Sequence, residues 1–246
     1  MATEKFADIQ YALFDMDEKL YTVATNKILE RYGKEMTWDI KAGCMGKPEL
    51  EACKHLLSFF PDIPLTLETY MKERNELQDQ LWPTVALLPG VSKLVQHLKK
   101  HNIPMAIATG SSREEYKLKT GHHQDIFGLF EGKVVCASDK QYNMRGKPFP
   151  DIFITAAREM LGRDVGDAQG EQTPAQVAER AKGLVLEDAL PGMQAGKRAG
   201  MKVVWVPDPN LLGVKDVKDG PETPDQVLHS LENFVPEQWG LPPYDS

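Results

Sequence analysis

The sequence has little cysteine and no long hydrophobic run. Its three thiols, Cys44, Cys53 and Cys136, include no CxxC pair, which is typical of reduced thiols and offers no zinc cage. No apolar run approaches the ~18–20 residues that cross a bilayer. The first ten residues, MATEKFADIQ, lack the apolar segment of a secretory signal. We therefore expect a cytoplasmic protein without membrane contact.

Basic side chains do not outnumber acidic ones. The chain has 29 Lys and Arg residues against 36 Asp and Glu residues, a formal net charge of −7 over 246 residues. Proteins that bind a nucleic-acid polymer normally carry a basic face, so we expect no such partner. Hydrophobic residues make up 41% of the chain, which is too apolar for a disordered protein. We expect a folded monomer.

Short apolar runs alternate with helical patterns along most of the chain. We predict strands at 11–14, 103–108, 134–136, 184–186 and 203–206, separated by helices that include 91–98, 152–161 and 192–199. Continuous apolar strands separated by helices indicate a parallel sheet with both faces covered. The fold class is therefore α/β, with a doubly wound parallel sheet.

Between residues 18 and 83 the pattern is helical only, with apolar residues at helical spacing before Gly33, Pro61 and Pro83. A helical block directly after the first strand indicates an inserted domain. We predict a core of residues 1–17 and 84–246 with an all-helical cap at 18–83. The polar stretch 163–182 is predicted to be a surface excursion.

Polar side chains follow three of the predicted strands, and a lysine precedes one of the predicted helices. In an open parallel sheet, ligands bind beyond the carboxyl ends of the strands, so these residues are expected to share one edge. They are Asp15 and Asp17 after the first strand, Thr109, Gly110 and Ser111 after the second, Glu187 and Asp188 after the fourth, and Lys147 before a helix.

This set of residues suits a phosphoryl site. The three aspartates are hard oxygen donors for Mg²⁺, while the Thr-Gly-Ser turn and Lys147 would form an anion pocket. One carboxylate could attack phosphorus to give an aspartyl-phosphate, with a second carboxylate two residues later as general acid and base. Each signal alone also has a structural explanation: a solvated turn, a helix N-cap, a loop lysine or a favourable helix dipole. Their order at four strand ends favours the site.

Four segments carry a family resemblance. FDMD, ATGSS, GKPFPDIF and LVLEDALPGMQAG resemble, in order, the motifs of the haloacid dehalogenase superfamily of aspartate-dependent phosphohydrolases, and the helical block resembles the cap of one subclass. The resemblance implies that Asp15 is the nucleophile and Asp17 the general acid/base. It also implies phosphate binding by Thr109, Gly110, Ser111 and Lys147, and Mg²⁺ binding by Asp15, Asp17 and Asp188 with support from Glu187.

A narrower resemblance concerns the substrate. YALFDMD, ATGSSREEYKLKT and SLENFVPEQWGLPPY are similar to segments of eukaryotic pseudouridine-5′-phosphatases. This similarity implies that the substrate is a small phosphorylated metabolite, with pseudouridine 5′-phosphate as first choice and other nucleotides or sugar phosphates after it.

The first motif departs from the family pattern. That pattern continues as DxDGxxxDTE, whereas Asp17 is followed at once by Glu18, so about six residues are missing in frame. Our hypothesis is that Asp15 and the anion pocket persist while the acid/base geometry is impaired. An alternative function is that of a catalytically impaired relative that binds phosphate ligands or a protein partner. An alternative explanation of the missing residues is an error in the gene model or an exon variant. A phospho-receiver domain is a further alternative, although it would have no cap between its first two strands.

Overall fold

The computed structural model describes residues 6–16, 20–45, 47, 49–213 and 221–245. Its sheet has six strands in the order β3-β2-β1-β4-β5-β6, and every neighbouring pair is parallel. The strands are β1 (Tyr11–Phe14), β2 (Met105–Thr109), β3 (Val134–Cys136), β4 (Gly183–Glu187), β5 (Lys202–Trp205) and β6 (Gln226–Val227). This confirms the predicted α/β class and adds β6, which is too short to give a periodic pattern.

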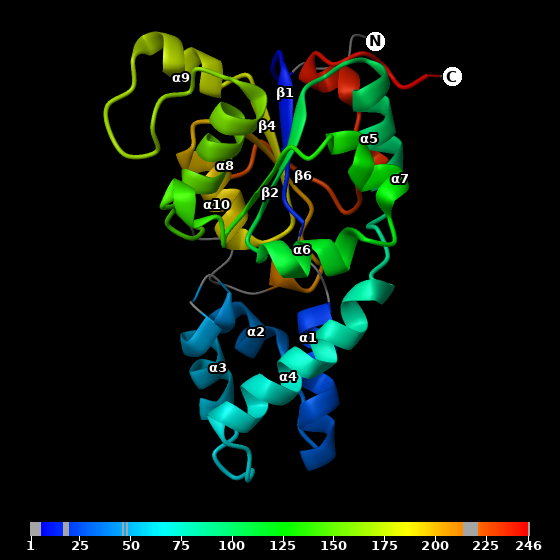
Figure 1. Cartoon of the computed structure of the whole chain (residues 1–246), viewed down its shortest axis with the longest axis vertical. Coiled ribbons are helices and arrows are strands. Elements are labelled where there is room, and N and C mark those ends of the chain that lie inside the picture. The colour runs from blue at the N-terminus through cyan, green and yellow to red at the C-terminus, as the bar shows by residue number, and fades with distance from the viewer. Residues whose placement is uncertain (1–5, 17–19, 46, 48, 214–220, 246) are drawn as a thin grey trace.

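Helices cover both faces of the sheet, and a group of helices extends beyond one end of its strands (Figure 1). The helices of the α/β part are α5 (Val91–Lys100), α6 (Arg113–Thr120), α7 (Gln124–Phe127), α8 (Asp151–Thr155), α9 (Pro174–Arg180) and α10 (Leu190–Arg198). A π-helical turn, Ala156–Met160, continues α8. Short 3₁₀ turns include Glu30–Tyr32, Trp82–Thr84, Gly128–Phe130, Lys140–Tyr142, Leu211–Gly213, Leu231–Asn233 and Pro236–Trp239.

The two faces of β1 belong to two apolar clusters. Tyr11 and Leu13 pack on one side, while Ala12 and Phe14 pack on the other, and all four are buried. Alternate residues of a strand point to opposite faces, so an uninterrupted apolar run is what a sheet buried on both faces requires. The sheet edge that follows Phe14 is therefore held by core packing from both sides.

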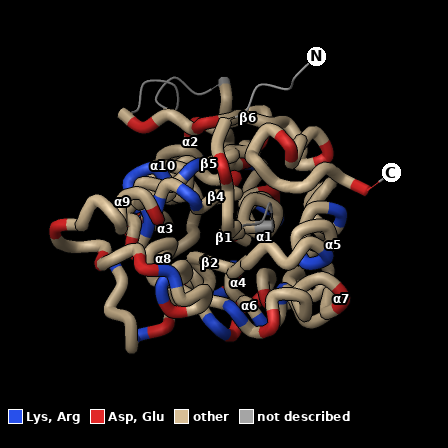
Figure 2. The backbone as a smooth tube through the Cα atoms, turned by 90° about the horizontal axis from the view of Figure 1, so that it is seen from above, with Lys and Arg blue, Asp and Glu red and all other residues tan. Residues whose placement is uncertain are grey.

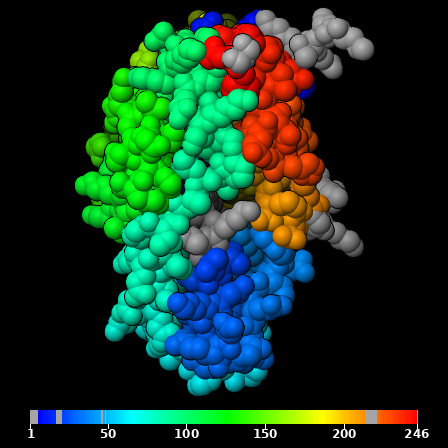
Figure 3. Space-filling view, turned by 90° about the vertical axis from the view of Figure 1, so that its right-hand side faces the viewer, coloured from blue at the N-terminus to red at the C-terminus, as the bar shows by residue number. Residues whose placement is uncertain are grey.

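The first four helices after β1 form a helical cap, which we define as α1 (Leu20–Leu29), α2 (Trp38–Cys44), α3 (Glu49–Ser58) and α4 (Leu67–Leu81). The cap has an apolar cluster of its own, which includes Ile28, Leu56 and Tyr70. In the space-filling view it forms the lower end of the molecule, in blue and cyan (Figure 3). The exact domain boundaries stay a prediction, since residues 17–19 lie outside the described part and residue 83 falls within the turn Trp82–Thr84.

The polar stretch 163–182, predicted to be a surface excursion, contains a helix, α9, that the sequence analysis did not anticipate. Thr173 caps this helix by accepting a hydrogen bond from the Gln176 N–H at 3.3 Å, and the Gln176 side chain accepts one from the Thr173 N–H at 3.0 Å. This capping box begins a helix despite the low hydrophobicity. Val177 is 54% exposed, so α9 does lie at the surface.

Charges of both signs are interspersed around the molecule when it is viewed from above (Figure 2). Among the helices that the structure describes, none is both long and apolar enough to cross a membrane.

Candidate active site

The predicted site begins where β1 ends. The Asp15 N–H donates to the carbonyl of Leu186 at 3.0 Å, which continues the pairing of β1 with β4 by one residue. This bond places Asp15 beside the end of β4, where Glu187 and Asp188 follow. One carboxylate oxygen from each of these three residues lies within 4.8 Å of the others. The structure thus brings Asp15 and Asp188 together as predicted, whereas Asp17 lies outside the described residues.

Glu187 is more deeply embedded than the sequence suggested. Its side chain is fully buried, and Oε2 accepts hydrogen bonds of 3.0 Å from the N–H groups of Asp188 and Ala189. These bonds hold the turn that leads into α10. The indole of Trp205 donates to the Asp188 carbonyl at 3.0 Å and supports the same turn from β5.

Lys147 lies between two of the carboxylates. Its Nζ is 2.7 Å from Asp15 Oδ1 and 2.5 Å from Glu187 Oε1. Burial alone would lower the pKa of Lys147, but the carboxylates of Asp15 and Glu187 outweigh it and raise that pKa. Burial and the Asp15 charge raise the pKa of Glu187, and Lys147 partly opposes this shift. Lys147 therefore stays a cation and limits repulsion within the acidic cluster.

The Thr-Gly-Ser turn after β2 is held by internal hydrogen bonds. The buried Thr109 hydroxyl donates to the Met16 carbonyl at 3.4 Å and accepts from the Ser111 N–H at 3.1 Å. Ser112 then caps α6 in a capping box with Glu115. The Ser111 N–H is used within the turn, and phosphate binding by Thr109, Gly110 and Ser111 stays a prediction. The hydroxyl-bearing residues Thr109 and Ser111, together with Gly110, are among the residues that line the cleft.

A cleft of about 1130 Å³ joins this sheet edge to the cap. Its lining includes the predicted residues Asp15, Thr109, Gly110, Ser111, Lys147 and Asp188, the cap residues Tyr21, Trp38, Lys41 and Arg74, and Trp82 of the turn that follows α4. Such a volume is ample for a metabolite-sized ligand. The cap therefore supplies the far wall of the candidate active site.

Lys119 is a residue of this region that the sequence does not single out. Its Nζ donates to Ser111 Oγ at 2.8 Å, and it lies over the rings of Trp82, at 4.2 Å from the centroid, and Tyr21, at 5.3 Å. The side chain is 2% exposed. Because Trp82 closes the cap segment and Ser111 belongs to the turn after β2, Lys119 connects the two walls of the cleft.

We expect Lys119→Met to weaken inhibition by inorganic phosphate about tenfold. The Ser111 hydroxyl would lose a charged donor, and such bonds contribute ~1.5–3 kcal/mol. Lys119 would act through Ser111, so KM should rise more than kcat falls. Lys117→Met, on the exposed face of the same helix, is the control. A fall in kcat without any change in KM or phosphate inhibition would contradict this role.

Gly192 is the second residue that the sequence does not single out. It lies in α10, and a Cβ added there would be 1.5 Å from Oε1 of Glu187. A glycine inside a helix is unfavourable by ~1 kcal/mol relative to alanine, so its position in a helical pattern was a usable signal of close approach. Gly192 leaves the space that Glu187 occupies.

We expect Gly192→Ala to lower both the melting temperature and the rate of the phosphate-ester hydrolysis that the sequence predicts. The new methyl group must displace Glu187, and overpacking of this kind costs ~1–3 kcal/mol, more than the gain in helix propensity. Gly128→Ala is a matched control because its Cβ would meet nothing within 4 Å. Equal melting temperatures and rates for the two variants would show that Glu187 is not held against Gly192.

Comparison with known proteins places this chain in a family. A family model described as haloacid dehalogenase-like hydrolase matches residues 9–200. The chain belongs to the haloacid dehalogenase-like hydrolases. This hydrolase is 40% identical to "(DL)-glycerol-3-phosphatase 2" of Arabidopsis thaliana, over 96% of the chain and 93% of the relative. It is 36% identical to "Probable pseudouridine-5'-phosphatase" of Drosophila melanogaster, over 99% of both chains.

A solved structure agrees with the fold of this hydrolase. It is the crystal structure of a HAD family hydrolase from Deinococcus radiodurans R1 with bound phosphate and sodium. The two structures superimpose with a TM-score of 0.71 at 21% identity. The match covers 96% of this chain and 99% of the other. The match therefore spans both the sheet and the helical cap of this chain.

Proposed function

We propose that this hydrolase cleaves small phosphate monoesters through an aspartyl-phosphate on Asp15. The observation that carries the proposal is the position of Asp15, which follows the end of β1, pairs with Lys147 and is one of the residues that line the cleft. Relatives over nearly the full chain are named as phosphatases of small molecules. A phosphatase of this kind needs a nucleophile, a fixed cation and a pocket for the leaving group, and Asp15, Lys147 and the cleft would supply them.

The reaction has two balanced steps. A carboxylate oxygen of Asp15 attacks phosphorus, the bond between phosphorus and the ester oxygen breaks, and the leaving alcohol takes up a proton. Water then attacks phosphorus of the aspartyl-phosphate, releasing inorganic phosphate and the Asp15 carboxylate. By the family resemblance, Asp17 would give the first proton and accept one from the water. Lys147 would offset the charge on the phosphoryl oxygens.

The acidic cluster fits Mg²⁺, because three carboxylate oxygens within 4.8 Å of one another are the hard donors that this ion prefers. We propose Asp15 and Asp188 as the ligands, together with Asp17 as the resemblance implies. Glu187 would support the site from the turn before α10. Bound there, Mg²⁺ would supply positive charge beside the phosphoryl group.

For the substrate we propose a nucleoside 5′-monophosphate, with pseudouridine 5′-phosphate as first choice. The cap wall of the cleft includes the aromatic rings of Trp38 and Tyr21, which suit contact with a planar base. Glycerol 3-phosphate is the competing substrate, since the name of the Arabidopsis relative specifies it.

The test is phosphate release from a panel of esters with Mg²⁺ and with a chelator. The panel contains pseudouridine 5′-phosphate, its isomer uridine 5′-monophosphate, glycerol 3-phosphate and sugar phosphates. We expect turnover with Mg²⁺ only, fastest for pseudouridine 5′-phosphate. Faster turnover of glycerol 3-phosphate would overturn the assignment of a nucleotide as substrate, whereas the assignment of phosphatase activity would stand.

The shortened first motif has its own test. Inserting the family-type segment GLLLDT after Asp17 should raise turnover if the missing residues impair the acid/base geometry. The relatives, which are named as phosphatases, give no support to a purely binding protein. Phosphate binding without turnover in both the parent chain and the insertion variant would nevertheless favour it.

A further inference from the structure

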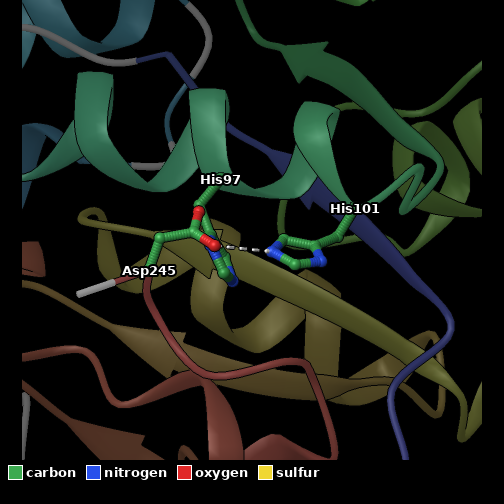
Figure 4. A group of neighbouring side chains, drawn as sticks. All are labelled: His97, His101 and Asp245. Carbon is green, nitrogen blue, oxygen red and sulfur yellow. Dashed lines mark ion pairs between the residues drawn. The ribbon is translucent and has the colours of Figure 1, made fainter.

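A second cluster of metal-ligating side chains lies apart from the cleft. His97 and His101 are four residues apart at the end of α5, and Asp245 lies beside them in the segment that follows Leu241 (Figure 4). One ring nitrogen from each histidine and one oxygen of Asp245 lie within 4.8 Å of one another. Residues four apart share one face of a helix, so both imidazoles project to the same side.

Hydrogen bonding determines which nitrogen of His97 is available. Nε2 is 2.9 Å from the carbonyl oxygen of Pro242. A carbonyl only accepts, so Nε2 carries the proton and Nδ1 of the neutral ring keeps its lone pair. Nδ1 is buried, and the described structure gives it no hydrogen-bond partner. His97 itself is 5% exposed, which makes an unused lone pair there unfavourable.

His101 and Asp245 present complementary atoms. Nε2 of His101 is buried, has no hydrogen-bond partner in the described part, and is 3.8 Å from Oδ1 of Asp245. The other oxygen, Oδ2, is held by Lys100 at 2.9 Å. The separation of 3.8 Å is too long for a hydrogen bond, but it suits two ligands of one ion, each ~2.0–2.2 Å from the metal.

We propose that His97, His101 and Asp245 form a binding site for Zn²⁺. Two imidazoles and one carboxylate are a ligand set that zinc accepts, with water completing the tetrahedron. The bond from His97 Nε2 to a backbone carbonyl is the outer-shell contact that orients metal-binding histidines. The ion would fasten residues 241–245 to α5.

The site is separate from the candidate active site. Helix α5 ends at Lys100 and precedes the first residue of β2, Met105, whereas the phosphate turn follows the last residue of β2, Thr109. The histidine cluster therefore lies toward the N-terminal ends of the strands, and the acidic cluster lies at their C-terminal ends. Zinc bound to the histidine cluster would stabilise the packing of Tyr244 on His97 without entering the cleft. The ring centroids of these two residues are 4.7 Å apart.

Calorimetric titration of the full chain with Zn²⁺ in excess Mg²⁺ tests the proposal, since Mg²⁺ occupies oxygen clusters and competes weakly for imidazoles. We expect one equivalent of Zn²⁺ to bind. His101→Ala should weaken this binding by more than the ~10–100-fold that loss of an outer-shell contact costs. Asp245→Asn, at an exposed position, should also weaken it and keeps the test valid if the first variant folds poorly.

His122→Ala is the control, because His122 is an exposed histidine outside the cluster. Zinc should also slow backbone hydrogen exchange at residues 241–245 in the parent chain and leave it unchanged in His101→Ala. Absence of zinc binding by the parent, or equal affinity in His101→Ala, Asp245→Asn and the control, would overturn the proposal.

Discussion

Asp15→Asn should abolish phosphatase turnover, with a fall of ~10⁴–10⁶-fold, the range for loss of a reacting catalytic group in well-measured hydrolases. An amide oxygen is a poor nucleophile, and the aspartyl-phosphate could not form. Binding should survive, because the variant removes a negative charge 2.7 Å from Lys147 and leaves that cation free to attract phosphate. We expect inorganic phosphate to bind at least as tightly as in the parent.

The measurement is kcat from phosphate release, together with phosphate affinity by calorimetry. Asp208→Asn is the matched control, since Asp208 is an acid that lines the same cleft and lies outside the acidic cluster. Substantial residual turnover in purified Asp15→Asn would reject the nucleophile assignment. Loss of phosphate binding as well would point instead to a general collapse of the site.

Lys147→Met should have the second-largest effect. The variant keeps the length of the side chain and removes its charge, so Asp15 and Glu187 would face each other without the cation between them. Removing one partner of a buried ion pair destabilises by ~3–5 kcal/mol. The side chains of Asp15 and Glu187 are 6% and 0% exposed, so water screens this repulsion little. Catalysis should fall ~10²–10³-fold, as when a fixed electrostatic donor is lost.

Thermal melting and kcat measure these two effects. Added Mg²⁺ should restore part of the stability, because an ion bound by the native carboxylates favours the folded state. It should not restore the rate, since the ammonium group beside Asp15 would still be absent. Lys140→Met, at an exposed lysine, is the control. Turnover close to that of the parent would show that Lys147 has no role in the reaction.

The fold could be predicted because strands and helices leave local patterns. The runs at residues 11–14 and 134–136 match β1 and β3, and the alternation of strands with helices gives the parallel sheet. The two elements that the sequence analysis did not predict, β6 and α9, were missed for local reasons as well. Strand β6 is two residues long, and α9 depends on a capping box rather than on apolar spacing.

The candidate site could be predicted only in part. The sequence identifies Asp15 and Asp188 as polar residues at strand ends, because an apolar run that stops marks the point where a buried strand ends. It identifies Lys147 as a lysine just before a helix. It does not reveal that Lys119 reaches Ser111 or that Gly192 makes room for Glu187. Those contacts depend on how helices pack on the turns beside them.

The order of the elements and the side chains that follow each strand can be inferred without a structure, since both are encoded by neighbours along the chain. The tertiary structure alone decided that Lys147 lies between Asp15 and Glu187, which are 132 and 40 residues away from it in the sequence. It also decided that His97 and His101 meet Asp245. Distances between remote residues depend on strand register and helix packing, and these are fixed by the burial of side chains from several elements at once.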